Sequence, residues 1–142
     1  MSGYGVTAMN ADGSWEYTNL RNSTSYIDFA YTFGKEKHMR ANLFFGYMKN
    51  LGLVDEDANL IAKSAGSDEA NTGMVFCKGN YNNIDNMWRV APSISYNLKH
   101  FNLGLEYEYT SVAYGTLMTD GTVSNTHDVA NHRICALIKY NF

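Results

Sequence analysis

Proline and long apolar runs are the features that this sequence has least of. A single proline, Pro92, accompanies eleven tyrosines, and this combination favours strands over helices. No run approaches the roughly 20 consecutive apolar residues that a membrane-spanning helix needs, and the mean hydropathy is −0.33. Helical membrane spans are therefore excluded, whereas half-polar strands remain compatible with this hydropathy.

Basic residues are also few and never clustered. Lys and Arg number 11 against 14 Asp and Glu, for a formal net charge of −3. Because no basic stripe is present that could follow a phosphate backbone, we expect no nucleic-acid partner. The length of 142 residues predicts a single domain, residues 1–142.

Motifs for catalysis and metal binding are missing. Cys77 and Cys135 lie far apart in the sequence, so they form neither a close metal-binding pair nor a disulfide framework. The serines and the four histidines match no hydrolase or zinc-protease motif. The acidic residues between positions 55 and 69 lack the spacing of a calcium loop. We therefore expect no enzyme activity, no metal and no cofactor.

The first ten residues, MSGYGVTAMN, contain neither the basic nor the apolar segment of a signal peptide. An exported protein needs such a segment. We therefore expect that it was removed or that the chain is a fragment.

Alternation of apolar and polar residues with a period of two is the strongest pattern present. It is clearest at the C-terminus, where Ile134, Ile138, Tyr140 and Phe142 share one face and Lys139 lies on the other. The pattern predicts six strands, at residues 3–9, 26–33, 39–48, 88–98, 101–110 and 129–142.

Four of these strands form two hairpins with short turns. The polar turn at 34–38 places Phe33 opposite Met39, and the two-residue turn at 99–100 places Leu98 opposite Phe101. In both registers one face is apolar throughout, so each register is consistent with its pattern.

The remaining segments are predicted to be long loops, near 10–24, 52–85 and 115–128, with a short helical turn near 58–63. In outer-membrane barrels, short turns lie on the periplasmic side and long loops outside. The sequence therefore predicts an all-β, antiparallel up-and-down meander of about six strands, forming the C-terminal portion of a transmembrane β-barrel. A soluble β-sandwich has similarly two-faced strands and remains the alternative.

Five segments resemble the C-terminal third of DcaP-like outer-membrane porins of the Bacteroides type. They are YTNL at 17–20, FFGYMKNLG at 44–52, NIDNMWRVAPSISYN at 83–97, GLEYEYTSVAYG at 104–115, and VSNTHDVANHRI at 123–134 with its YNF end. The resemblance implies a C-terminal fragment of a large barrel in the bacterial outer membrane. It also implies a homotrimer, and passive diffusion of small hydrophilic, often anionic, solutes across the lipid bilayer.

The two faces carry the candidate functional residues. The pore-lining candidates are Arg40, Arg89, Glu106, Glu108, Arg133 and Lys139, because charged side chains on a lumen wall select permeant ions. Ile138, Tyr140 and Phe142 are candidates for the lipid-facing surface, and their Tyr-x-Phe ending resembles the assembly signal of outer-membrane barrels.

Other readings of these residues remain open. The charged residues could instead pair across strands, since the second hairpin places Arg89 diagonal to Glu108. The whole chain could be a soluble binding module. It could also be a small structural or adhesive barrel, which needs two further strands within 10–25 and 70–85.

Overall fold

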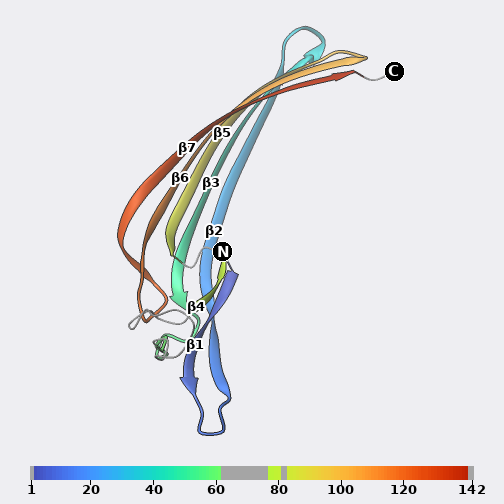
Figure 1. Cartoon of the computed structure of the whole chain (residues 1–142). Helices are drawn as coiled ribbons and strands as arrows, with labels where there is room; N and C mark the ends of the chain where they lie inside the picture. Colours follow the sequence, from blue (N-terminus) through green and yellow to red (C-terminus); the bar gives the residue numbers. More distant parts are fainter. Residues whose placement is uncertain (1, 62–76, 81–82, 141–142) are drawn as a thin grey trace. The chain divides into compact units, whose positions relative to one another are not determined.

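The computed structural model describes residues 2–61, 77–80 and 83–140. Its strands are β1 (Ser2–Met9), β2 (Trp15–Phe33), β3 (Met39–Leu53), β4 (Cys77–Asn80), β5 (Ile84–Asn97), β6 (Phe101–Leu117) and β7 (Val123–Tyr140), with a 3-10 turn, η1, at Lys35–Lys37 (Figure 1). Within these ranges there is no α-helix, and no helix long and apolar enough to cross a membrane.

The strands form one sheet in the order β4-β1-β2-β3-β5-β6-β7. The six long strands follow one another in an antiparallel up-and-down meander, as the sequence predicts. The short strand β4 comes from the connection between β3 and β5 but pairs with β1, from Ser2 opposite Asn80 to Gly5 opposite Cys77. The fold class is confirmed, with one strand more than expected.

The chain divides into two compact units, and five strands contribute to both. Unit 1 comprises Met1–Ser23, Met48–Asn86 and Ala113–Asp128. Unit 2 comprises Thr24–Tyr47, Met87–Val112 and Val129–Phe142. Both η1 and the turn between β5 and β6 belong to unit 2, whereas the other connections between strands belong to unit 1.

Unit 1 contains a buried apolar core formed by Leu20, Leu53 and Leu60. The segment that follows β3 is held against this core by backbone hydrogen bonds. The amide of Leu60 donates to the carbonyl of Thr119 over 2.6 Å, and the amide of Ile61 donates to that of Val6 over 3.0 Å. Part of the predicted 52–85 loop is therefore packed structure.

The predicted loops at 10–24 and 115–128 are wrong over most of their length. Only residues 10–14 separate β1 from β2, and only residues 118–122 separate β6 from β7. Both connections are tight turns with the same chemistry: Gly13 and Gly121 have φ values of 84° and 77°, and the preceding aspartate accepts hydrogen bonds from Ser14 or Thr122. Those hydrogen bonds lower the pKa of both aspartates.

The two loop predictions failed because these strand segments lack alternation. Ladder hydrogen bonds join backbone groups, so strands form even where polar side chains occupy both faces. The 52–85 loop is interrupted by β4. The helical turn predicted at 58–63 is wrong for residues 58–61, which are irregular, and its last two residues lie outside the described residues.

Unit 2 has the two predicted hairpins. Leu98 and Phe101 exchange backbone hydrogen bonds of 2.8 and 3.3 Å, which confirms the two-residue turn and its register. In the first hairpin the turn at 34–38 contains η1. A Cβ added at Gly46 would lie 4.0 Å from the Cβ of Tyr26, in agreement with the register that pairs Phe33 with Met39.

Candidate functional site

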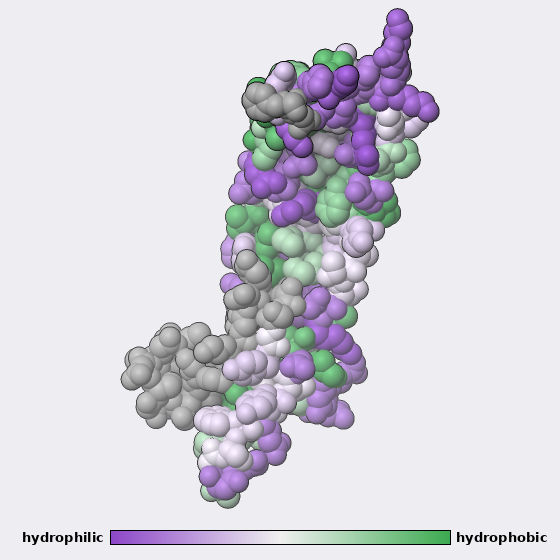
Figure 2. Space-filling view, turned by 90° about the vertical axis from the view of Figure 1, so that its right-hand side faces the viewer, coloured by the Kyte–Doolittle hydropathy of each residue, from purple (hydrophilic) through white to green (hydrophobic). Residues whose placement is uncertain are grey.

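The sheet of unit 2 presents two chemically different faces. The polar face is defined by Arg40, Asn42, Arg89, Ser93, Ser95, Glu106, Glu108 and Arg133, several of which contact one another across strands. The apolar face is defined by Ile27, Phe29, Leu43, Phe45, Ile94, Leu103, Leu105, Tyr107, Ile134 and Ile138. Figure 2 shows one view of the surface, in which hydrophilic and hydrophobic residues are interspersed.

The residues of the apolar face are exposed, from 38% for Leu103 to 74% for Ile134. By contrast, nearly all the buried hydrophobic residues of the described chain belong to unit 1; Ala91 is the exception. Exposure of a contiguous apolar surface of this kind marks a surface that contacts lipid or another protein.

On the polar face, four of the six pore-lining candidates form one charged cluster, which we define as Arg89, Glu106, Glu108 and Arg133. Arg133 Nη2 lies 3.0 Å from Glu108 Oε2 and 3.6 Å from Glu106 Oε1. Arg89 Nη1 lies 3.4 Å from the same Glu108 oxygen. The Glu108 side chain is only 13% exposed, so two guanidinium groups compensate one sheltered carboxylate.

This cluster predicts a measurable coupling between Glu108 and Arg133. Glu108→Gln is expected to lower the unfolding free energy by about 1–2 kcal/mol, because hydrogen bonds to charged groups are worth about 1.5–3 kcal/mol and the arginines are partly solvated. A double-mutant cycle with Arg133→Gln, measured by urea unfolding in detergent, should show coupling of about 1 kcal/mol. Glu16→Gln, at an exposed residue of unit 1, is the control. Coupling near zero would contradict the pairing.

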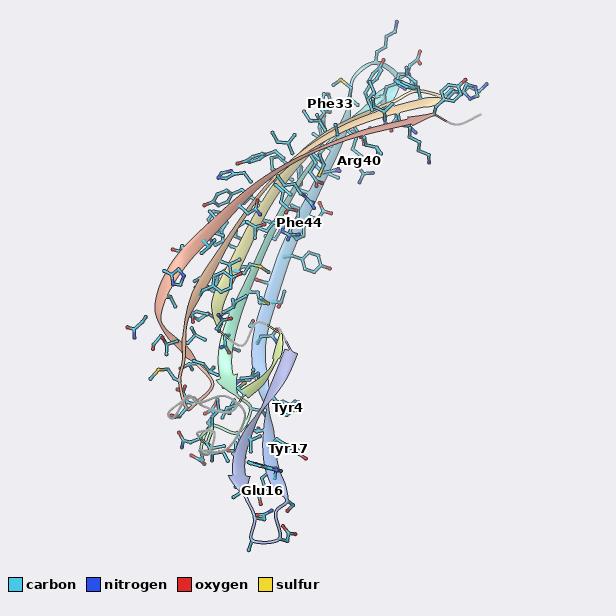
Figure 3. All side chains as sticks on the ribbon, viewed as in Figure 1. Tyr4, Glu16, Tyr17, Phe33, Arg40 and Phe44 are labelled. Carbon is cyan, nitrogen blue, oxygen red and sulfur yellow. The ribbon has the colours of Figure 1, made fainter. Side chains whose placement is uncertain are left out.

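The other two pore-lining candidates are arranged differently. Arg40 Nε donates to Asn42 Oδ1 over 2.9 Å, and neither Arg40 nor Lys139 has a carboxylate partner among the described residues. Figure 3 shows the Arg40 side chain on β3. Two basic groups are therefore left without acidic partners in the part of unit 2 that the structure describes.

The lipid-facing candidates are placed as follows. Ile138 and Tyr140 are 72% and 56% exposed, and Ile138 shares the face of Ile134 by alternation along β7. Phe142 lies outside the described residues. The same alternation puts Leu137, which the sequence pattern does not favour there, on the polar face, where a Cβ added at Gly104 would meet the Leu137 Cβ at 3.5 Å.

An aromatic cluster on the apolar face includes His132, which the sequence analysis did not assign to that face. The Tyr107 hydroxyl and His132 Nδ1 are hydrogen-bonded over 2.7 Å, the His132 ring lies 4.9 Å from that of Tyr109, and the Tyr109 ring lies 5.0 Å from that of Trp88. The signal was present, since His132 has the same parity as Ile134 and Ile138.

Unit 1 has its own ion pair, in which Lys49 Nζ contacts the carboxylate of Asp85 at 2.6 Å. Burial raises the pKa of Asp85, but hydrogen bonds from Lys49 and Asn86 and the charge of Lys49 outweigh it, so the pKa lies below its ordinary value. Nowhere in 2–61, 77–80 or 83–140 do three His, Cys, Asp or Glu side chains gather as metal ligands.

Comparisons with protein-family models, with characterised proteins and with solved structures give no match to this chain.

Proposed function

We propose that the chain is part of the wall of an outer-membrane β-barrel channel of the porin type, related to the DcaP-like porins and possessing the trimeric assembly of that family. Its apolar face contacts lipid, and its polar face lines a passage for small hydrophilic solutes, anions included. In this proposal the chain supplies the C-terminal strands of the barrel.

The exposed apolar face of unit 2 carries this proposal. Each Leu, Ile or Phe left in water rather than buried costs about 1.5–3 kcal/mol, so the nine such residues on this face, with Tyr107 beside them, need a cover. A β-sandwich provides that cover with a second sheet. The described strands form one sheet only, and a bilayer is a cover that needs no further protein layer.

The dimensions of the apolar face support the same proposal. From Trp88 on β5 to Leu98, the residue that follows the end of β5, the chain advances by roughly 33 Å at about 3.3 Å per residue. Tilted as barrel strands are, this length spans about 25 Å, which is the height of the lipid-facing band of outer-membrane barrels. By alternation, the next positions on this face are Asn86 on β5 and Asp128 on β7. Each is the last residue of a segment of unit 1, so the apolar band ends at the limit of unit 2.

Aromatic residues support the proposal at the two limits of this band. Trp88, Tyr109 and His132 cluster near one limit, and Tyr96 and Tyr140 lie toward the turn between β5 and β6. Aromatic rings with one polar atom prefer the interface between hydrocarbon and headgroups.

Vesicle flotation tests the proposal. The purified chain, refolded from detergent into vesicles of outer-membrane lipid, is expected to float with the vesicles and to resist extraction by carbonate. The chain alone is expected to give no discrete conductance steps, because the described residues 24–33 of β2 and 129–140 of β7 form edges of unit 2 whose backbone groups hydrocarbon cannot satisfy. A monodisperse monomer in detergent-free buffer would exclude a membrane wall.

A further inference from the structure

The polar face of unit 2 contains a hollow of about 350 Å³. Asn42, Ser93, Ser95, Gly104, Glu106 and Cys135 contribute to its lining. The hollow exists because Ser93, Ser95 and Gly104 are small, whereas longer side chains surround them. Gly104 has no positive φ, and a Cβ there would meet only Leu137, at an ordinary contact distance of 3.5 Å. The backbone conformation therefore does not require glycine at position 104, and the missing side chain leaves open space in the hollow.

On β3, the lining residue Asn42 is bound by a basic group. Arg40 Nε donates to Asn42 Oδ1 over 2.9 Å, and Asn42 Nδ2 donates to Ser93 Oγ over 3.4 Å. Arg40, whose side chain Figure 3 shows on β3, is therefore bound to Asn42, a residue of the lining, and is one hydrogen bond away from the hollow. No carboxylate of the described chain lies within ion-pair distance of Arg40, so its guanidinium keeps donors for an anionic group.

An acidic group lines the hollow on the β6 side. Among the described residues, the cation paired with Glu106 is Arg133, at 3.6 Å, and Arg133 lies closer to Glu108, at 3.0 Å. Glu106 is 41% exposed. Its carboxylate therefore keeps acceptor sites for a cationic group, unlike Glu108, which contacts both Arg89 and Arg133.

The strands that hold Asn42 and Glu106 are spaced so that a small molecule can reach from one to the other. Ser93 lies opposite Glu106 in the confirmed register, and Asn42 bonds to Ser93, so Asn42 and Glu106 lie two strand spacings apart, about 10 Å. An α-amino acid holds its ammonium and carboxylate roughly 3 Å apart. Charge-assisted hydrogen bonds of about 2.8 Å at each end extend its reach to a similar distance.

We infer that this hollow is a subsite for small zwitterions such as amino acids. The carboxylate is held by Arg40 and the ammonium by Glu106, with the hydroxyls of Ser93 and Ser95 between them. A monoanion finds only the first partner and meets repulsion from Glu106, and a monocation finds only the second. The inference rests on the proposed function, because the polar face must be in contact with water.

Saturation-transfer NMR on the whole chain in detergent micelles tests the subsite with three probes of similar size: L-alanine, propionate and propylammonium. L-alanine is expected to give at least threefold more transfer than either of the others. Gly104→Val, which fills the hollow, should reduce the L-alanine signal to the level of propionate. Asn102→Val, on the same face of β6 but outside the hollow, should leave it unchanged.

Two charge variants keep the test informative should Gly104→Val fail to fold. Arg40→Gln and Glu106→Gln should each reduce L-alanine transfer severalfold, and Glu106→Gln should raise that of propionate. Equal transfer for the three probes, or L-alanine transfer unaffected by all three variants, would overturn the subsite. Vesicle flotation of the same sample separates the two proposals: a chain that floats but does not prefer L-alanine refutes the subsite alone, and a chain that does not float refutes the membrane wall.

Discussion

Leu105→Lys is expected to prevent insertion of the chain into vesicles, whereas Asn102→Lys on the opposite face of the same strand is expected to leave insertion unchanged. Leu105 is 53% exposed and lies across from Ile94 in the register of β5 and β6, near the middle of the apolar band. A lysine on the lipid face at the bilayer midplane costs about 2–4 kcal/mol. At about 1.4 kcal/mol per factor of ten, this shifts the insertion equilibrium by one to three orders of magnitude.

The measurement is the fraction of each variant that floats with vesicles after refolding. Asn102 has the parity of Gly104 and Glu106, so its substituted lysine faces the polar side and reaches water. Equal losses from both variants would mean that the two faces do not differ in environment. If Leu105→Lys inserts at the wild-type level, the proposal that lipid covers the apolar face is refuted.

Gly52→Ala is expected to destabilise unit 1 by about 2–3 kcal/mol. Gly52 has a φ of 78°, and an added Cβ would lie 2.7 Å from the backbone oxygen of Asp120. A left-handed conformation costs a residue other than glycine about 1–2 kcal/mol. Relief of the clash must also move the Asp120 carbonyl away from the amide of Leu53, which donates to it over 2.9 Å, and that weakens a hydrogen bond worth about 1 kcal/mol.

Gly13→Ala is the matched control. Gly13 has a similar φ of 84°, but no atom lies within 4 Å of the position of its Cβ. This variant should therefore show the conformational cost alone, about 1–2 kcal/mol. Amide hydrogen exchange at Leu53, together with urea unfolding, measures both variants. Equal destabilisation by the two substitutions would show that the contact with Asp120 does not strain unit 1.

The two faces of unit 2 could be predicted because alternation is a local property. Strands expose successive side chains on opposite sides, so Ile94 and Leu105 could be assigned to one face and Ser93 and Glu106 to the other without knowledge of the rest of the chain. The pairing of Leu98 with Phe101 follows from the length of the turn between them. The diagonal between Arg89 and Glu108 then follows from that register.

The boundaries of the strands in unit 1 could not be predicted in the same way. MTDGT at 118–122 has the same Asp-Gly signal as NADGS at 10–14, and it was available in the sequence as a second turn signal. What the sequence does not show is that β2 begins at Trp15 and β7 at Val123, because polar residues occupy both faces at 21–25 and at 124–128 and interrupt the alternation.

The sequence by itself determined the all-β class, the two faces of unit 2 and the register of its hairpins, since each depends on residues close together along the chain. Only the tertiary structure decided that β4 pairs with β1, that Leu60 packs on Leu20 and Leu53, and that Arg89 and Arg133 share the carboxylate of Glu108. The pairing of β4 with β1, the contact of Leu60 with Leu20 and the arrival of Arg133 at Glu108 each join residues far apart in sequence. Which distant segments meet depends on the free energy of the whole sheet, and no local period of the sequence contains that information.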